Sequence, residues 1–323
     1  MSRRITLRCI LFLFSTVALA QGQPSNSANK YFEQGTAKYN RGDLDQAIAD
    51  FTKAIEISSQ PIHHKRNDER LRTAANSFSN TEDELSNITI IDPLTALALN
   101  GRGLAWLKKG QIEQALNDFE RALRIRPGLV EAYVNRGGAR YAQGDNDGAL
   151  SDWTKAIEMN SKLAAPYVNR GAALLKTGKV DAAVADLDKA IALDSKEAKA
   201  YGHRGFASIL RNDLDGAIAD FDAAIKLNPQ LPWVFEGRGC VELVRDELEQ
   251  AIADFDQAIA LNPQFAVAYM KRGLALLNQG RATEALRDFA QAQTLDANLK
   301  ERLGPMIEAA RSSPPQRIKV TAN

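Results

Sequence analysis

The sequence predicts an all-α fold in which antiparallel helix pairs repeat along the chain. The first observation is one segment written almost identically twice: AIADFDAAIKLNP begins at Ala217, and AIADFDQAIALNP begins thirty-four residues later at Ala251. The second is a row of glycines with the same spacing, at Gly103, Gly137, Gly171, Gly205, Gly239 and Gly273. A fixed period of this length is typical of a stack of similar helical units.

Each unit carries small and aromatic residues at helical spacing after its glycine. After Gly205, for example, Ala217 and Ala224 flank Phe221, and the other units repeat this order with an aromatic residue or leucine in the middle. Spacings of three and four residues place these side chains on one face of a helix. We therefore expect two helix backbones to approach closely at the small residues, with the aromatic ring filling the angle between the helices.

The turn inside each pair is predicted where the sequence offers a residue that tolerates a left-handed backbone. Asn212 and Asp246 stand at this position in two units, and both residue types tolerate that conformation. The remaining units have glycine there, at Gly42, Gly110, Gly144, Gly178 and Gly280. Helices of about fourteen residues are marginally stable alone. Stability is therefore expected to come from stacking on neighbouring units.

This pattern resembles the tetratricopeptide repeat, in a variant with Arg-Gly where the common form has Leu-Gly. The resemblance covers Ala28 to about Leu299 and rests on seven units that share phase, glycine, alanine and aromatic positions. It implies a right-handed superhelical solenoid whose concave wall is lined by the first helices and binds an extended peptide or a partner helix. The sequence departs from the family's closing proline at Ser59, Ser161, Ser195 and Ala297.

The period also predicts how the chain is organised. The expected segments are a signal peptide (1–20), a short linker (21–27), a first repeat (28–61), a degenerate repeat or insertion (62–95), six tandem repeats (96–299), a capping helix (300–311) and a disordered tail (312–323). The capping helix would cover apolar surface that the last unit leaves exposed. Within 62–95, a helix is expected from about Thr81 to Ile91.

The N-terminus has the pattern of an export signal. Three arginines precede an apolar run that starts at Cys9 and ends in Ala-Leu-Ala at Ala20, which is typical of a cleaved secretory signal. The run is too short to span a bilayer, so we expect no stable membrane span and a periplasmic or secreted bacterial protein. The stretch SRRITLR also resembles a twin-arginine signal, and both export routes stay open. Loss of Cys9 would leave Cys240 without a disulfide partner.

Composition and motifs argue against catalysis. The chain has 41 basic and 40 acidic residues and a net charge of +1, so it has no chain-wide field for nucleic acid. His63 and His64 are adjacent and would point to different faces of a helix, and His203 is expected to be packed or exposed. No Ser-His-Asp set, Gly-rich phosphate loop or CxxC motif is present. We therefore expect no enzyme, no metal site and no cofactor.

Charged residues at fixed positions predict a ladder of structural ion pairs. An aspartate directly precedes the aromatic residue or leucine of each unit. It is Asp50 in the first unit and Asp118, Asp152, Asp186, Asp220, Asp254 and Asp288 in the six tandem ones. An arginine precedes the glycine of the same units, at Arg102, Arg136, Arg170, Arg204, Arg238 and Arg272. The first unit has Gln34 instead, which suggests that each arginine pairs with the preceding unit's acid, with Glu84 serving Arg102. Pairing within one unit is the alternative.

The expected function is a non-catalytic interaction scaffold or adaptor in the cell envelope. The candidate groove residues of the last three units are apolar: Phe206, Leu210, Trp233, Cys240, Val244, Met270 and Leu274. Earlier units offer Asn100, Lys108 and Lys176 instead. A row of exposed apolar side chains usually marks a partner surface, here for an apolar peptide segment or helix. Burial of some of these residues between units is the alternative.

Two further functions remain open at this point. A repeat array can act as a passive structural or assembly factor through its convex face. It can also be the recruiting arm of a periplasmic enzyme complex, although no segment outside the repeats is long enough to form a catalytic domain.

Overall fold

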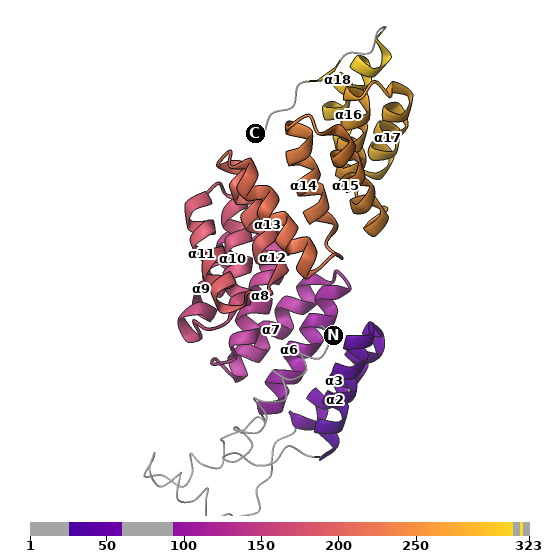
Figure 1. Ribbon diagram of the computed structural model, residues 1–323. Helices are drawn as coiled ribbons and strands as arrows, with labels where there is room; N and C mark the ends of the chain where they lie inside the picture. The colour runs from indigo at the N-terminus through magenta and orange to yellow at the C-terminus, as the bar shows by residue number, and fades with distance from the viewer. Residues whose placement is uncertain (1–25, 60–92, 313–316, 319–323) are drawn as a thin grey trace, which may run out of the picture. The chain divides into compact units, whose positions relative to one another are not determined.

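The computed structural model describes residues 26–59, 93–312 and 317–318, and every regular element in these ranges is a helix. The predicted all-α fold of paired helices is confirmed (Figure 1). The chain divides into two compact units, residues 1–159 and residues 160–323, which are described separately below as unit 1 and unit 2. The predicted signal peptide and the helix expected from Thr81 to Ile91 lie outside the described residues.

Unit 1 contains three helix pairs in its described part. The first helices of these pairs are α2 (Asn26–Arg41), α6 (Pro93–Lys108) and α8 (Val130–Gln143), and the second helices are α3 (Leu44–Ser58), α7 (Ile112–Ile125) and α9 (Asn146–Met159). Each second helix packs against the first helix of its own pair, and α3 and α7 also pack against the next pair.

The helices on either side of residues 60–92 pack directly against each other. Phe51 of α3 shares one apolar cluster with Leu94 and Leu99 of α6. The hydroxyl of Thr95 donates a hydrogen bond of 2.8 Å to Ser58 Oγ, and both residues are buried. α3 and α6 are therefore direct neighbours in the stack of described helices.

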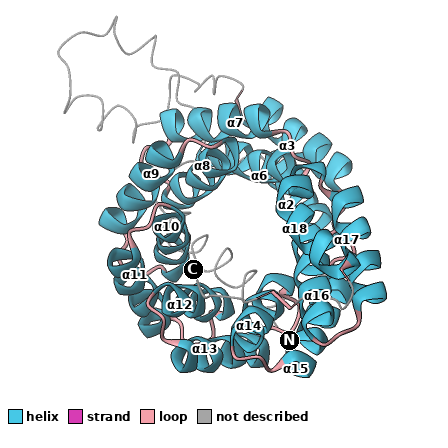
Figure 2. Ribbon diagram, turned by 90° about the horizontal axis from the view of Figure 1, so that it is seen from above, coloured by secondary structure: helices cyan, strands magenta, loops and turns pink. Residues whose placement is uncertain are grey.

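The described part of unit 2 contains four helix pairs and a terminal helix. Its first helices are α10 (Ala164–Lys176), α12 (Ala198–Leu210), α14 (Pro232–Val244) and α16 (Ala266–Asn278). Its second helices are α11 (Val180–Leu193), α13 (Leu214–Leu227), α15 (Leu248–Leu261) and α17 (Ala282–Leu295). Consecutive first helices pack side by side and form one wall of the unit, with the second helices behind them (Figure 2).

The repeated small and aromatic residues form the core. The rings of Phe119, Phe221, Phe255 and Phe289 are fully buried, as are the alanines that flank them. A Cβ atom added at Gly205 would lie 2.8 Å from the ring of Phe221, so the ring occupies the space that a side chain on the facing helix would need. The predicted close approach of the two backbones is confirmed.

The predicted turn residues adopt left-handed backbone conformations. Asn212 has a φ of 58° and Asp246 has a φ of 64°, and the five turn glycines have φ values between 74° and 93°. Aspartate tolerates this region better than most residues. Asp246 is exposed, so the turn between α14 and α15 carries a negative charge at the surface.

Unit 2 ends in a short 3-10 turn, η1 (Ala297–Leu299), and α18 (Lys300–Arg311). This helix packs against α17 and, over a smaller area, against α16. Leu303 of α18 is fully buried in the cluster that also holds Phe289. Within the described ranges, none of the helices has both the length and the apolar character needed to cross a bilayer.

Candidate partner-binding surface

Six arginine–aspartate ion pairs each join the first and the second helix of one helix pair. In each, Nε and Nη2 of the arginine donate to both carboxylate oxygens of the aspartate sixteen residues later, at 2.6–2.9 Å. Each aspartate is at most 8% exposed. The pairs are Arg102–Asp118, Arg136–Asp152, Arg170–Asp186, Arg204–Asp220, Arg238–Asp254 and Arg272–Asp288. Two-point, charge-assisted bonds of this kind fix geometry as well as adding energy.

The pairing therefore lies within one helix pair, the alternative that the sequence left open, and Arg102 binds Asp118 of its own pair. Glu84, suggested as its partner, lies outside the described residues. Both oxygens of each aspartate accept from the arginine of its own helix pair. Ion pairs between neighbouring helix pairs do exist, but they use an aspartate two positions after the buried one. Nη1 of Arg204 donates to Asp188 of the preceding pair at 2.7 Å, and Arg238 and Arg272 make the equivalent bonds to Asp222 and Asp256.

The predicted groove residues are exposed to very different degrees. Leu210 is 53% exposed, the most exposed large hydrophobic side chain in the described part of the chain. Phe206, Trp233 and Val244 are half-buried. These four residues lie on α12 and α14, which pack side by side, and are called the apolar row below.

Two predicted groove residues are core residues instead. Met270 and Leu274 of α16 are only 2% and 7% exposed. Met270 packs in the cluster that includes Leu303 of α18, and Leu274 packs in the cluster around Phe255. Their assignment to the groove is wrong, because in the last pair this face of the first helix is covered by residues that follow the repeats.

An aromatic stack lies at the apolar row. The ring of Trp233 stacks on His203 with centroids 4.7 Å apart and on Phe206 with centroids 6.0 Å apart. A Cβ atom at Gly202 would lie 2.5 Å from the Trp233 ring, so glycine leaves room for the stack. Burial, helped by the charge of Lys199, lowers the pKa of His203 to about 4. His203 is therefore neutral at pH 7 and extends the apolar surface.

Cys240 lies in a polar cluster between α14 and α16. Its Sγ is 3.4 Å from Glu236 Oε1 and accepts a hydrogen bond of 2.8 Å from Lys271 Nζ, which also pairs with Glu236. Burial, with the charge of Glu236, raises the pKa of the Cys240 thiol to about 12, so the thiol is protonated at neutral pH. Among the described residues, no group of three or more His, Cys, Asp or Glu side chains is arranged to hold a metal ion.

Two residues of the predicted disordered tail contact the C-terminal ends of α14 and α16. The side-chain amide of Asn278 donates to the carbonyl oxygen of Ile318 at 2.9 Å and accepts from its N–H at 2.8 Å. The guanidinium of Arg317 pairs with Asp246. Sequence reasoning missed Asn278, although the preceding pairs have valine, leucine, lysine and alanine at the same register.

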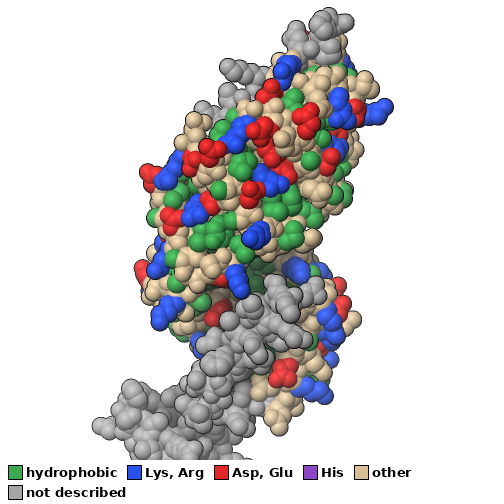
Figure 3. Space-filling view, in the orientation of Figure 1, with side chains coloured by type: hydrophobic (Ala, Val, Ile, Leu, Met, Phe, Trp, Pro, Cys, Tyr) green, Lys and Arg blue, Asp and Glu red, His purple; other side chains and the backbone are tan. Residues whose placement is uncertain are grey.

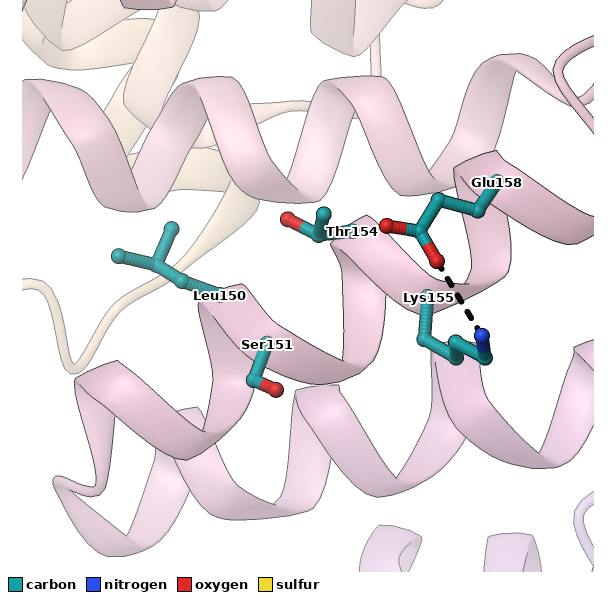
Figure 4. A pocket seen from close by; sticks show the side chains of 5 residues that line it. All are labelled: Leu150, Ser151, Thr154, Lys155 and Glu158. Atoms are coloured by element: carbon teal, nitrogen blue, oxygen red, sulfur yellow. Dashed lines mark hydrogen bonds and ion pairs between the residues drawn. The ribbon is translucent and has the colours of Figure 1, made fainter.

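Two other surface features, a hollow on α9 and the distribution of charge, do not indicate a binding site. A shallow hollow of about 300 Å³ on α9 is lined by Leu150, Ser151, Thr154, Lys155 and Glu158 (Figure 4). Its charged members pair with each other at 3.2 Å. Basic and acidic side chains are interspersed on the face seen in Figure 3, in keeping with the net charge of +1. Neither feature gathers residues that would hold a particular ligand.

Glu242 of α14 gives unit 2 a pH-dependent stability. The residue is 9% exposed, and burial, followed by the charge of Asp254, raises the pKa of its carboxyl group to about 7. The folded state therefore favours the protonated form. The contribution of Glu242 to stability is greatest below the unfolded-state pKa of about 4.5 and is lost as the pH rises through about 7.

We expect Glu242→Gln to raise the melting temperature at pH 8 and to leave it nearly unchanged at pH 5. The expected gain at pH 8 is on the order of 1 kcal/mol, reduced from the full shift by solvent screening. Thermal melts at both pH values test this, with the exposed Glu301→Gln as the matched control. An equal change at both pH values would contradict a titrating Glu242.

Family models match more than half of the chain. A model described as "TPR repeat" matches residues 103–144, 137–178 and 245–280. Models described as "Tetratricopeptide repeat" match residues 30–61, 168–232 and 266–299. The chain is also similar to heat shock protein STI1 of Saccharomyces cerevisiae, with 32% identity over 102 residues, which cover 31% of this chain and 17% of that protein.

Solved structures share the fold at low identity. A tetratricopeptide repeat protein from Parabacteroides merdae matches with a TM-score of 0.60 and 20% identity, over 89% of this chain and all of that one. A chain of the APC/C hetero-tetramer Cut9–Hcn1 matches with a TM-score of 0.64 and 18% identity, over 83% and 53% of the two chains. The Pseudomonas aeruginosa pilF structure matches with a TM-score of 0.56 and 20% identity, over 66% and 97%. With its paired helices, its thirty-four-residue period and these matches, the chain belongs to the tetratricopeptide repeat proteins.

Proposed function

We propose that this protein is a non-catalytic adaptor that binds an apolar segment of a partner protein, either an extended peptide or a helix, along the first helices of unit 2. Tetratricopeptide repeat proteins are in general protein–protein interaction scaffolds. The observation that carries the proposal is the apolar row, in which Leu210 is 53% exposed and Phe206, Trp233 and Val244 are half-buried.

The spacing within the row supports a single contact surface. Phe206 and Leu210 are four residues apart on α12 and share one helical face. Trp233 and Val244 are eleven residues apart on α14, which again places them on a common face. Aromatic residues in a partly desolvated row are the kind of side chain that dominates binding energy.

The face formed by the second helices offers less apolar surface to a partner. The other exposed large hydrophobic residues of the described chain are Met159 and Leu227, at 37% and 38%. Each stands at the C-terminal end of a different second helix, and single exposed apolar residues are normal on a protein surface. This favours the adaptor over a passive structural factor that works through that face. A role as the recruiting arm of an enzyme complex would use the same apolar row.

We expect the double variant Leu210→Ser, Val244→Ser to reduce recovery of the natural partner about tenfold or more, because each truncated contact removes roughly 1 kcal/mol of binding energy. Quantitative pull-down from an envelope extract of the native source measures this. Leu227→Ser is the matched control, since it removes an exposed leucine from a second helix. Unchanged recovery in the double variant would reject the apolar row, and turnover of a substrate by the purified protein alone would reject the adaptor.

We also propose that the protein is exported to the periplasm or secreted, on the basis of the basic and apolar N-terminal sequence that ends at Ala20. Cleavage there gives a mature protein that begins at Gln21. Mass spectrometry of the protein from its native source is expected to find that N-terminal peptide. Recovery of an intact N-terminal peptide beginning at Met1 or Ser2 would refute export.

A further inference from the structure

The side chain of Asn278 holds the backbone of another residue at two points. Nδ2 donates to the carbonyl oxygen of Ile318 at 2.9 Å, and Oδ1 accepts from the N–H of Ile318 at 2.8 Å. An amide can satisfy both backbone groups of one residue only where they face the same side, as they do along the edge of an extended segment. The contact therefore selects an extended backbone, whatever its side chains are.

Side-chain contacts add sequence preference to this backbone contact. Ile318 packs against the cluster of Leu243 and Leu274 and against the cluster that includes Leu303. Arg317 pairs with Asp246 across the same edge of the unit. Successive side chains of an extended segment point in opposite directions, so an aliphatic side chain can face the protein while the preceding basic one reaches the acidic turn.

The ion pair of Arg317 is expected to be weaker than the contacts of Ile318. The side chains of Arg317 and Asp246 are 59% and 62% exposed, so their ion pair is screened and is expected to favour a positive charge only weakly. Asn278 and the apolar contact of Ile318 are half-buried and carry most of the recognition.

The side chain of Asn278 is not needed to close the turn that follows α16. The turn after α16 is closed by backbone bonds from Gln279 to Ala275 and from Gly280 to Leu277. At the same register, the five preceding pairs have Lys108, Ala142, Lys176, Leu210 and Val244. The fold thus does not require an amide at this position. The first pair also carries one, Asn40, which lies exposed near the C-terminal end of α2.

We propose that Asn278, Asp246 and the apolar edge at Leu274 form a site for an extended peptide in which a basic residue is followed by an aliphatic one. Arg317–Ile318 of the same chain is its resident occupant, and a partner segment with the same pair displaces it. The proposal rests on the proposed function, since it places a partner segment beside Val244 on the first-helix wall. A tethered occupant competes at high effective concentration, so the site is closed to weak ligands.

The test uses the full-length chain and a fluorescent peptide with the sequence of residues 314–323, PPQRIKVTAN. A release variant, Arg317→Asp with Ile318→Asp, should vacate the site and bind the peptide at least about tenfold more tightly than the wild type in an anisotropy titration. Adding Asn278→Ala should weaken binding about tenfold, because two hydrogen bonds are lost. Adding Asp246→Asn, which keeps the left-handed turn, should weaken it only about threefold.

Peptide variants test the same site without altering the protein, so the result does not depend on how Asn278→Ala folds. A peptide with aspartate in place of the isoleucine should lose binding to the release variant. Equal binding by wild type and release variant would overturn occupancy within the chain, as would wild-type dimers in light scattering that disappear in the release variant. If neither Asn278→Ala in the protein nor aspartate in place of the isoleucine in the peptide weakened binding, the proposed site would be wrong. That outcome would leave the apolar row standing, because the Leu210→Ser, Val244→Ser variant tests the row separately.

Discussion

Replacing Phe221 with alanine should lower the free energy of unfolding by about 3–5 kcal/mol, the range for truncating a fully buried phenylalanine. The ring is fully buried, and its edge-on contact with Phe206 has centroids 5.2 Å apart. The neighbours on the facing helices are Gly205 and Gly237, which have no side chains to move into the cavity. Urea denaturation followed by circular dichroism measures the loss.

A second substitution checks that a cavity causes this loss. Gly205→Ala alone should destabilise the protein, because its Cβ would lie 2.8 Å from the ring of Phe221. In the Phe221→Ala background the same change should be stabilising, since the methyl group fills part of the cavity and alanine favours the helix by about 1 kcal/mol. The half-exposed Leu227→Ala is the control for loss of apolar area at the surface. If Gly205→Ala had the same sign in both backgrounds, close packing of this glycine against the ring would be contradicted.

The sequence predicted the paired fold because its period repeats in residues whose size matters. A ring such as Phe221 needs small residues opposite it, so the positions of glycine and alanine in the sequence indicate where the helices pack. The turns at Asn212 and Asp246 were predictable for a similar reason, because few residues tolerate a positive φ.

The partners in the ion-pair ladder could not be chosen from sequence. Arg204 lies eighteen residues after Asp186 and sixteen residues before Asp220. Both separations join a first helix to a second helix, and sequence spacing does not say which acid the guanidinium faces. The structure gives Asp220, with the exposed Asp188 of the preceding pair as the other partner.

Groove residues were predicted less well where the repeat ends. Leu210 is exposed, but Leu274, two periods further on, is only 7% exposed in a cluster that includes Met306 of α18 and Ile318. Periodicity carries no information about segments that follow the last repeat. The amide of Asn278 differs from the apolar and basic residues of the five preceding pairs, although Asn40 stands at the same register in the first pair, and its partner Ile318 lies forty residues away.

Replacing Arg204 with methionine should lower the free energy of unfolding by about 1–3 kcal/mol, because it leaves the carboxylate of Asp220 unpaired in a buried position. Asp220 is 8% exposed and receives two hydrogen bonds from Arg204, at 2.9 Å and 2.8 Å. Hydrogen bonding to Asp220 raises the pKa of Arg204 above its ordinary value, so the pair stays charged in the folded state. Thermal and urea denaturation measure the change.

A double-mutant cycle shows whether the buried pair or the exposed one holds the helices together. Asp220→Leu should also destabilise the protein, and the Arg204→Met, Asp220→Leu variant should lose less than the sum of the two single changes, since no charge is then left buried alone. Asp188→Ala should cost less than about 1 kcal/mol, because the Asp188 side chain is 53% exposed and its bond to Arg204 is screened by solvent. Arg211→Met, which removes an exposed pair with Asp181, is the matched control. An unchanged melting temperature in Arg204→Met, or strict additivity in the cycle, would mean that close packing of Phe221 and its glycines stabilises the helix pair without help from the ladder.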